Sequence, residues 1–198
     1  MTRRLITHLR YGALAMPNFE EELAFMTQHW GLAQVHREGD VAWLGAEGTP
    51  EPFVVRLRKG EKRIDLVAFG AANRDDVNEL HSRLVANGVQ IIHGPQELTQ
   101  FGGGYGMRFF DNEGRTVEVS TEVELKGSRK IQEREAIPVK LSHFVVNTTD
   151  IQLARHTWKA QGLDAGPAVH AHRRTGKGML NWQITVRDDG QRLFDGTL

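Results

Sequence analysis

The sequence predicts an α+β fold made of repeated β-α-β-β-β units, and three observations lead to that prediction. A short apolar run, then Asn or Asp, then an amphipathic segment occurs three times along the 198 residues. Each amphipathic segment meets a glycine where a helix would end. Short apolar runs separated by turn residues follow each of them. Three copies of one pattern in the same order indicate an internal repeat.

Spacing defines the repeat. In each copy the opening residue lies seven positions before the Asn or Asp: Tyr11 and Asn18, Leu66 and Asn73, His143 and Asp150. The side-chain oxygens of Asn and Asp accept from free N–H groups in the first turn of a helix, so each is a predicted N-cap. Glu21 stands three residues after Asn18, as in a capping box. The glycines at the predicted helix ends are Gly31, Gly88 and Gly162.

The predicted strands divide the chain into three units and one connection. The first two units span about residues 8–59 and 62–122, and together they form a predicted N-terminal domain over 1–123. Residues 124–140 are polar and highly charged, and they are interpreted as a linker. A third unit follows over 141–198, and we expect it to be incomplete because the sequence stops where its last strand would begin.

Composition excludes several classes of function. Lys+Arg and Asp+Glu number 25 each, so nothing predicts the basic surface that nucleic acid or an anionic membrane attracts. The absence of cysteine excludes disulfides, thiol catalysis and thiolate metal sites. No apolar run approaches the roughly 20 residues of a membrane-spanning helix, and the N-terminus lacks the apolar core of a signal peptide. We therefore expect a cytoplasmic protein with no nucleic-acid or membrane partner.

Three motifs resemble one protein superfamily. Residues 101–120, FGGGYGMRFFDNEGRTVEVS, contain a glycine-rich loop, a strand, an aspartate turn and a strand in which Glu alternates with hydrophobic residues. FEEELAFMTQHWGL (19–32) and PVKLSHFVVNTTD (138–150) supply a first helix and an opening strand of the same kind. Over residues 8–150 the chain resembles the vicinal oxygen chelate superfamily of glyoxalases, bleomycin-resistance proteins and type I extradiol dioxygenases. Within it, the resemblance is nearest to the dioxygenases.

The resemblance implies that units pair into a cup, with a curved mixed sheet, helices outside and a divalent metal inside. Side chains alternate between the faces of a strand, so one face of each opening strand looks into the cup. The predicted cavity-lining residues are Tyr11, Ala13, Leu66, Ala68, Val145 and Asn147. His143 holds the opening position of the third unit, and the resemblance implies that it is a metal ligand.

Glu118 and a pair of histidines are further metal candidates. Glu118 matches the carboxylate ligand of the family on the last strand of the second unit. Tyr11 and Leu66 stand where other ligands would be, so the N-terminal domain is expected to be a non-catalytic partner. His170 and His172 lie two residues apart on a predicted strand and would share a face, where they could bind one metal or form a solvated surface.

Three functions remain open. The first is an extradiol ring-cleavage dioxygenase of aromatic compound catabolism, which would use a divalent metal, with Fe(II) expected, on catecholic or other vicinal-oxygen substrates. Its remaining ligands would come from a fourth unit, supplied by a partner subunit or by further C-terminal sequence; without them this chain is expected to be inactive, and whether it binds a metal by itself stays open. The second is a metal-free binding protein of the bleomycin-resistance type, for a small aromatic ligand. The third is a glyoxalase-type lyase or isomerase that uses His143 and Glu118.

An odd number of units also predicts the oligomeric state. A third unit without a partner leaves an apolar sheet face uncovered, and such faces usually find a partner. We therefore expect a homodimer in which the third units face one another.

Overall fold

A computed structural model describes residues 5–160, 171–173 and 180–184 of the chain. The first unit consists of β1 (His8–Met16), α1 (Phe19–Gln28), β2 (Ala33–Glu38), β3 (Val41–Gly45) and β4 (Val55–Lys59). The second consists of β5 (Arg63–Gly70), α2 (Arg74–Ala86), β6 (Ile91–Glu97), β7 (Tyr105–Phe110) and β8 (Thr116–Thr121). The described part of the third comprises β9 (Phe144–Thr148), α3 (Ile151–Ala160), β10 (Ala171–Arg173) and β11 (Leu180–Ile184).

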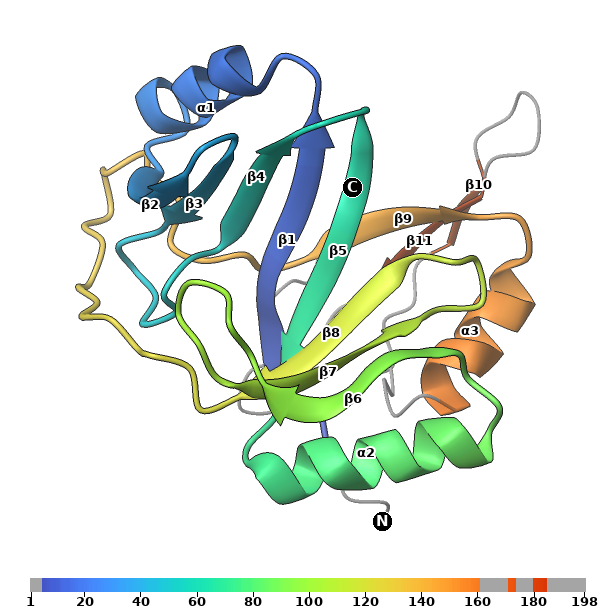
Figure 1. Ribbon diagram of the computed structural model, residues 1–198. Helices are drawn as coiled ribbons and strands as arrows, with labels where there is room; N and C mark the ends of the chain where they lie inside the picture. Colours follow the sequence, from blue (N-terminus) through green and yellow to red (C-terminus); the bar gives the residue numbers. More distant parts are fainter. Residues whose placement is uncertain (1–4, 161–170, 174–179, 185–198) are drawn as a thin grey trace.

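The first two units form one curved, mixed sheet of eight strands, in the order β2-β3-β4-β1-β5-β8-β7-β6 (Figure 1). The opening strands β1 and β5 pair antiparallel at its centre, and each lies parallel to the last strand of its own unit. The strands β2 and β6 are the two edges, so the sheet curls without closing. The predicted α+β fold of repeated units is confirmed.

The register places two residues of the last strands at equivalent positions. Arg56 on β4 lies opposite Ala13 of β1, as Glu118 on β8 lies opposite Ala68 of β5. The first unit therefore carries a guanidinium where the second carries a carboxylate.

Two predicted helix caps are confirmed. The Asn73 side chain accepts from the backbone N–H of Asp76 at 2.9 Å, and Asp150 accepts from the N–H groups of Gln152 and Leu153. These bonds satisfy donors that a helix leaves free in its first turn, so α2 and α3 begin where the repeat places them.

The capping box predicted at Asn18 is wrong. Its side chain makes no cap bond, and its amide instead donates to the carboxylates of Glu21 and Glu22 at 3.4 Å. The predicted helix ends at Gly31 and Gly88 are confirmed, because both glycines adopt left-handed backbone angles with φ near 70°. Gly162 lies outside the described residues.

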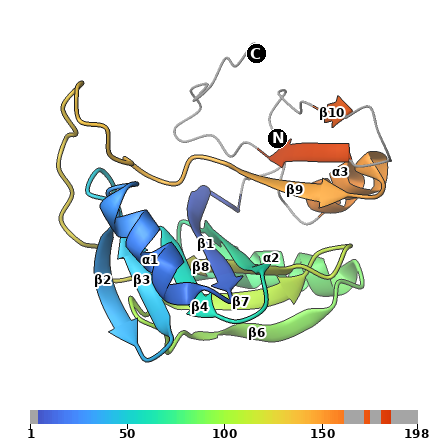
Figure 2. The same ribbon diagram turned by 90° about the horizontal axis from the view of Figure 1, so that it is seen from above.

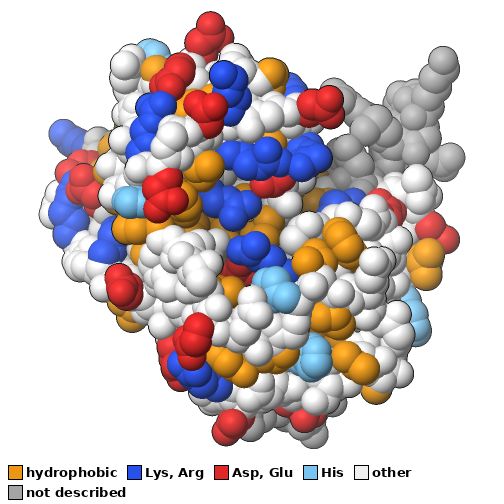
Figure 3. Space-filling view, viewed as in Figure 1, with side chains coloured by type: hydrophobic (Ala, Val, Ile, Leu, Met, Phe, Trp, Pro, Cys, Tyr) orange, Lys and Arg blue, Asp and Glu red, His pale blue; other side chains and the backbone are white. Residues whose placement is uncertain are grey.

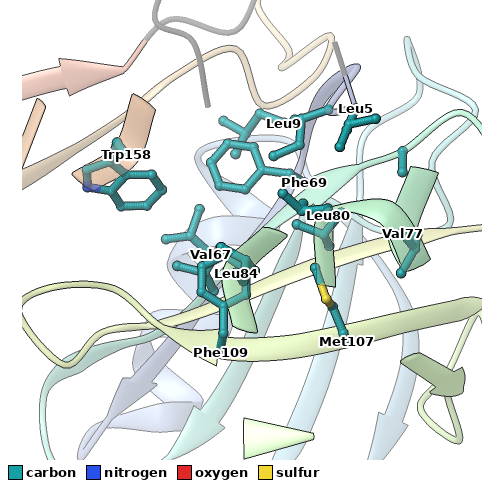
Figure 4. Packing of buried hydrophobic residues seen from close by; sticks show 14 of the residues in the cluster. Leu5, Leu9, Val67, Phe69, Val77, Leu80, Leu84, Met107, Phe109 and Trp158 are labelled. Atoms are coloured by element: carbon teal, nitrogen blue, oxygen red, sulfur yellow. The ribbon is translucent and has the colours of Figure 1, made fainter. Parts of the chain in front are cut away.

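The third unit lies on the outer face of the eight-stranded sheet. In Figure 2 it is above the sheet, with β6 at the bottom of the view. Its three described strands form a separate sheet in the order β10-β11-β9. From α3, Trp158 packs against Phe69 with ring centroids 6.2 Å apart, in the same core that covers Leu80 and Leu84 of α2 (Figure 4). The outer face of the sheet thus carries α2 and α3 together.

The predicted linker runs along the first unit without helix or strand. Lys126 donates to the carbonyls of Ala46 and Thr49 at 2.7 and 3.0 Å, and Arg129 pairs with Glu47 at 2.5 Å. These contacts fix the path by which the chain reaches the third unit, while the division into domains stays a prediction. Among the helices of the described part, each is too short or too polar to cross a bilayer.

Candidate functional site

The concave face of the eight-stranded sheet, called the cup here, is set by strand alternation. On β5, Val67 and Phe69 point outward into the core beneath α2, while Leu66 and Ala68 point inward. On β8, Val117 and Val119 likewise face outward, so Glu118 between them faces the cup. The strands therefore aim two sets of side chains in opposite directions.

Aromatic rings fill the base of the cup. Tyr11 contacts Phe53 with ring centroids 4.5 Å apart, and Trp43 and Phe101 continue the cluster. The predicted cavity-lining residues of the first two units lie in this cluster: Tyr11, Ala13, Leu66 and Ala68. They point into the cup, and the rings bury them at its base.

Glu118 lies fully buried in this base and is surrounded by donors. Arg108 approaches its Oε2 through Nε at 2.8 Å and through a terminal nitrogen at 2.7 Å. The Tyr11 hydroxyl donates to the same oxygen at 3.1 Å. Ser120 and Gln100 donate to Oε1 at 3.1 and 3.3 Å. Burial, and the charge of Glu118, raise the pKa of Tyr11, so that its hydroxyl stays protonated as a donor.

This donor set does not fit a metal at Glu118. A carboxylate offers about four lone-pair positions, and hydrogen bonds already occupy them. The guanidinium of Arg108 also supplies the positive charge that a buried carboxylate requires. A metal would have to displace Arg108 and find about two further ligands. Within the described residues, His, Asp and Glu side chains form no group of three that could hold an ion.

Arg108 was missed from the sequence, although a signal was present. The turn DNEG (111–114) joins β7 to β8, and pairing the strands outward from it places Phe110 opposite Thr116 and Arg108 opposite Glu118. Opposite charges at directly facing positions of an antiparallel pair predict an ion pair. Counting the register would have indicated a neutralised carboxylate.

The glycine-rich loop shapes the rim of the cup. Gly102, Gly103 and Gly104 all have positive φ, which side chains other than glycine rarely adopt. The loop thereby turns Gln100 and Phe101 inward, where Gln100 bonds Glu118 and Phe101 stacks on the base. The loop serves the packing of the cup.

A cavity of about 530 Å³ lies in the mouth of the cup, and Arg56, Arg58, Asp65 and Arg108 are among the residues that line it. Asp65 accepts from Arg58 at 2.6 and 2.7 Å and from Arg56 at 3.1 Å. The hydrogen bonds from Arg58, together with the nearby charges, lower the pKa of Asp65 to about 2. The mouth thus holds fixed charges at every ordinary pH.

On the third unit, unlike in the cup, the candidate metal ligand is exposed. His143 directly precedes β9 and is exposed, with Ser142 Oγ 3.3 Å from its Nδ1. Val145 is 46% exposed, whereas Val146 and Thr148 are each only 4% exposed. Strand alternation therefore places His143 with Val145 on the open face of this sheet.

For the other candidate site residues of the third unit, the structure describes at most the strand on which they lie. Asn147 lies on β9 and His172 on β10, opposite Asn181, but their side chains lie outside the described residues, as does His170. The eight-stranded sheet separates Glu118 from α3, because Glu118 faces the cup and Trp158 packs on the outer face. The structure does not bring Glu118 and the third unit together around one ion.

Comparisons with known proteins agree with this geometry. The sequence model of the Glyoxalase/Bleomycin resistance protein/Dioxygenase superfamily matches residues 6–119. A manganese-dependent 2,3-dihydroxybiphenyl 1,2-dioxygenase from Geobacillus genomosp. 3 is 33% identical over 115 residues, which are 57% of this chain and 36% of that protein.

Solved structures share the fold. The Mn(II)-bound glyoxalase from Novosphingobium aromaticivorans superposes with a TM-score of 0.76 at 33% identity, over 84% of this chain and 54% of that one. A homoprotocatechuate 2,3-dioxygenase from Brevibacterium fuscum superposes with a TM-score of 0.68 at 17% identity, over 91% of this chain and 57% of that one.

The chain spans about a third of the curated relative and just over half of each of these two structures. The match of the sequence model over residues 6–119 covers more than half of the 198 residues and coincides with the two units that build the cup. The chain therefore belongs to the glyoxalase/bleomycin resistance/dioxygenase superfamily.

Proposed function

We propose that this chain takes part in metal-dependent extradiol cleavage of catecholic rings. In this proposal the eight-stranded sheet is the non-catalytic domain, and the third unit carries the first metal ligand, His143. The contrast between the two candidate ligands supports it most: Glu118 is buried and neutralised, whereas His143 stands exposed on an open sheet face. The name of the relative from Geobacillus genomosp. 3 supports the reaction type.

The proposed metal is divalent, either Mn(II) or Fe(II). Two relatives are manganese proteins by name, and the resemblance to extradiol enzymes favours iron. When bound, such an ion would act as a Lewis acid that holds two vicinal oxygens of the substrate. His143 can supply one imidazole, and further ligands would have to come from outside the described residues, because those residues form no group of three His, Asp or Glu side chains that could hold an ion.

Metal binding by the purified chain tests the proposal. We expect Mn(II) or Fe(II) to bind to the wild type and to be lost in His143→Ala. The matched control is His156→Ala, which removes another exposed histidine of the same unit, on α3, and should leave binding unchanged. Equal metal content in both variants, or no metal in the wild type after reconstitution with either ion, would contradict the assignment.

Activity separates ring cleavage from the second candidate function. The 33% identity to a protein named as a glyoxalase, over 84% of this chain, favours a glyoxalase-type reaction as the alternative. Metal-loaded protein should turn catechol or 2,3-dihydroxybiphenyl into a yellow ring-cleavage product. Glyoxalase-type turnover by the metal-loaded protein without any catechol cleavage would replace the first candidate by the second.

The predicted homodimer stays a prediction. On the third unit, Val145 and Leu153 are 46% and 52% exposed. Light scattering that reports a monomer across the micromolar range would contradict it.

A further inference from the structure

We propose that the mouth of the cup is a metal-free binding site for a small aromatic carboxylate, held by Arg56 and Trp43. The site is independent of the proposed ring cleavage, since it lies on the opposite side of the sheet from the third unit. Nothing in the ring-cleavage proposal uses these two residues.

The cavity has the dimensions of a ligand site. Its volume of about 530 Å³ falls within the roughly 300–1,000 Å³ of small-molecule pockets. Figure 3 shows the corresponding face, on which Lys and Arg side chains gather across the middle with hydrophobic surface between them. Both a charged and an apolar part of a ligand would find partners there.

Two of the residues that line this cavity each carry a buried donor without an acceptor. The indole Nε1 of Trp43 and the Nε of Arg56 are covered from solvent, and neither has a hydrogen-bond partner in the described part of the chain. Trp43 itself is only 5% exposed. Folded proteins leave few buried donors unpaired, so each such group calls for an explanation. A bound carboxylate would supply the missing acceptors.

Strand pairing makes the two residues that carry these donors neighbours. Trp43 and Arg56 face each other across the antiparallel pair of β3 and β4, where opposite side chains on one face lie in contact range. A planar guanidinium recognises a carboxylate through two parallel hydrogen bonds, and an indole N–H can only donate. The pair therefore selects an acceptor that bears negative charge.

The charges around the cavity leave a positive surplus beside Arg56. Asp65 is the single carboxylate that serves three guanidinium groups, those of Arg56, Arg58 and Arg63. Glu118 pairs with Arg108, while at the rim Glu97 shares Arg74 with Glu122, and Glu38 contacts the imidazole of His36. The positive surplus is therefore confined to the arginines around Asp65.

The rest of the cavity suits a flat apolar body. Val41, Trp43 and Leu98 supply apolar surface, and the guanidinium planes of Arg56 and Arg108 can stack on an aromatic ring. A small aromatic acid combines this body with the charge that the donors require.

Benzoate is the probe, and titration calorimetry in EDTA is the first test, because EDTA removes any metal at the proposed catalytic site. We expect benzoate to bind, the isosteric but uncharged benzamide to bind at least tenfold more weakly, and cyclohexanecarboxylate to bind several-fold more weakly. Arg56→Gln should weaken benzoate at least tenfold, and Trp43→Phe several-fold. Benzamide binding equal to that of benzoate, or no benzoate binding at millimolar concentration, would overturn the proposal.

Matched controls separate the site from general effects. Arg83→Gln removes a guanidinium that pairs with Glu79 on α2, and Trp30→Phe removes a half-exposed indole outside the cavity. Both variants should bind benzoate as the wild type does. If they weaken it equally, the binding is nonspecific.

The indole N–H signals of the wild type give a second test, in which Trp43→Phe serves only to assign the signal of Trp43. The chain has four tryptophans, so four such signals are expected in a nitrogen-correlated NMR spectrum. Benzoate should shift one of them, the signal that disappears in Trp43→Phe, and leave the other three in place. A shift of a different indole, or of none, would contradict the site.

Discussion

The cup and the third unit hold their candidate metal ligands in opposite environments. In the cup, Glu118 has no exposed surface and accepts from Arg108, Tyr11, Gln100 and Ser120. On the third unit, His143 is exposed on a sheet face that the described residues leave open. The ligand candidate on the last strand of the second unit thus lies in a closed polar cluster, whereas the candidate that opens the third unit is an exposed imidazole.

The difference shows how a cup is built without a metal. A buried carboxylate is stable only if an opposite charge and hydrogen bonds replace its water shell. A metal ion is one source of that charge, and the cross-strand partner Arg108 is another. In this cup Arg108 supplies the charge, and Tyr11 and Leu66 pack the base beside it.

Replacing Trp158 tests whether α3 is anchored on the outer face of the sheet. Of the substitutions considered, it should lower the free energy of unfolding the most. Trp158→Ala should lower the free energy of unfolding by about 4 kcal/mol, since it empties a large site in the core shared with Phe69. Amide hydrogen exchange should accelerate most in β9 and α3. Leu153→Ala, at an exposed position on the same helix, should change stability by less than about 0.5 kcal/mol. Equal losses in both variants would mean that α3 is not anchored through Trp158.

Replacing Arg108 tests whether its charge stabilises the buried Glu118 in the cup. Arg108→Met should lower the free energy of unfolding by about 3 kcal/mol, because it leaves the carboxylate of Glu118 buried without its countercharge. Urea denaturation at pH 7 measures the loss.

A second substitution identifies the cause of that loss. Adding Glu118→Gln to Arg108→Met should restore most of the stability, because no buried charge is left unpaired. Arg83→Met, which breaks an exposed pair with Glu79, should cost less than about 1 kcal/mol. If the double variant is no more stable than Arg108→Met, lost packing and not charge explains the effect.

Replacing Asp65 should have the smallest effect on the free energy of unfolding, and the effect should depend on pH over a defined range. Its pKa is lowered to about 2 in the folded chain by the bonds from Arg58 and the charges of the neighbouring arginines, against an ordinary value of about 4. A depressed folded-state pKa stabilises the fold above about pH 4, and this contribution is lost as the pH falls from about 4 to about 2. After solvent screening we expect about 1 kcal/mol between wild type and Asp65→Asn at pH 6, vanishing near pH 2. A difference that stays constant over this range would contradict the assignment.

Much of the fold could be predicted because local patterns fix it. The caps Asn73 and Asp150 and the helix ends Gly31 and Gly88 mark the repeat by the chemistry of single residues. Alternation then assigned Glu118 to the cup, which the hydrogen bond from Tyr11 confirms. Asn18 shows the limit of such patterns, because a side chain able to cap α1 binds two nearby carboxylates instead.

The chemistry of the cup was harder to predict because it depends on contacts between distant segments. Gln100 reaches Glu118 only after the glycine-rich loop turns it inward, and Trp43 meets Arg56 only through strand pairing. A sequence pattern identifies Glu118 as a possible ligand, but it does not show that four other side chains already surround it. The state of a polar residue follows from its partners, and those come from the tertiary fold.

The proposal places metal binding at the third unit and its exclusion from the cup at Arg108. Titration of the isotopically labelled chain with Mn(II), followed by NMR, tests this most directly because the ion broadens nearby amide signals. We expect broadening centred on His143, with the signals of Tyr11, Ala68 and Glu118 keeping their intensity. Broadening of those three cup signals at the same metal concentration would contradict it.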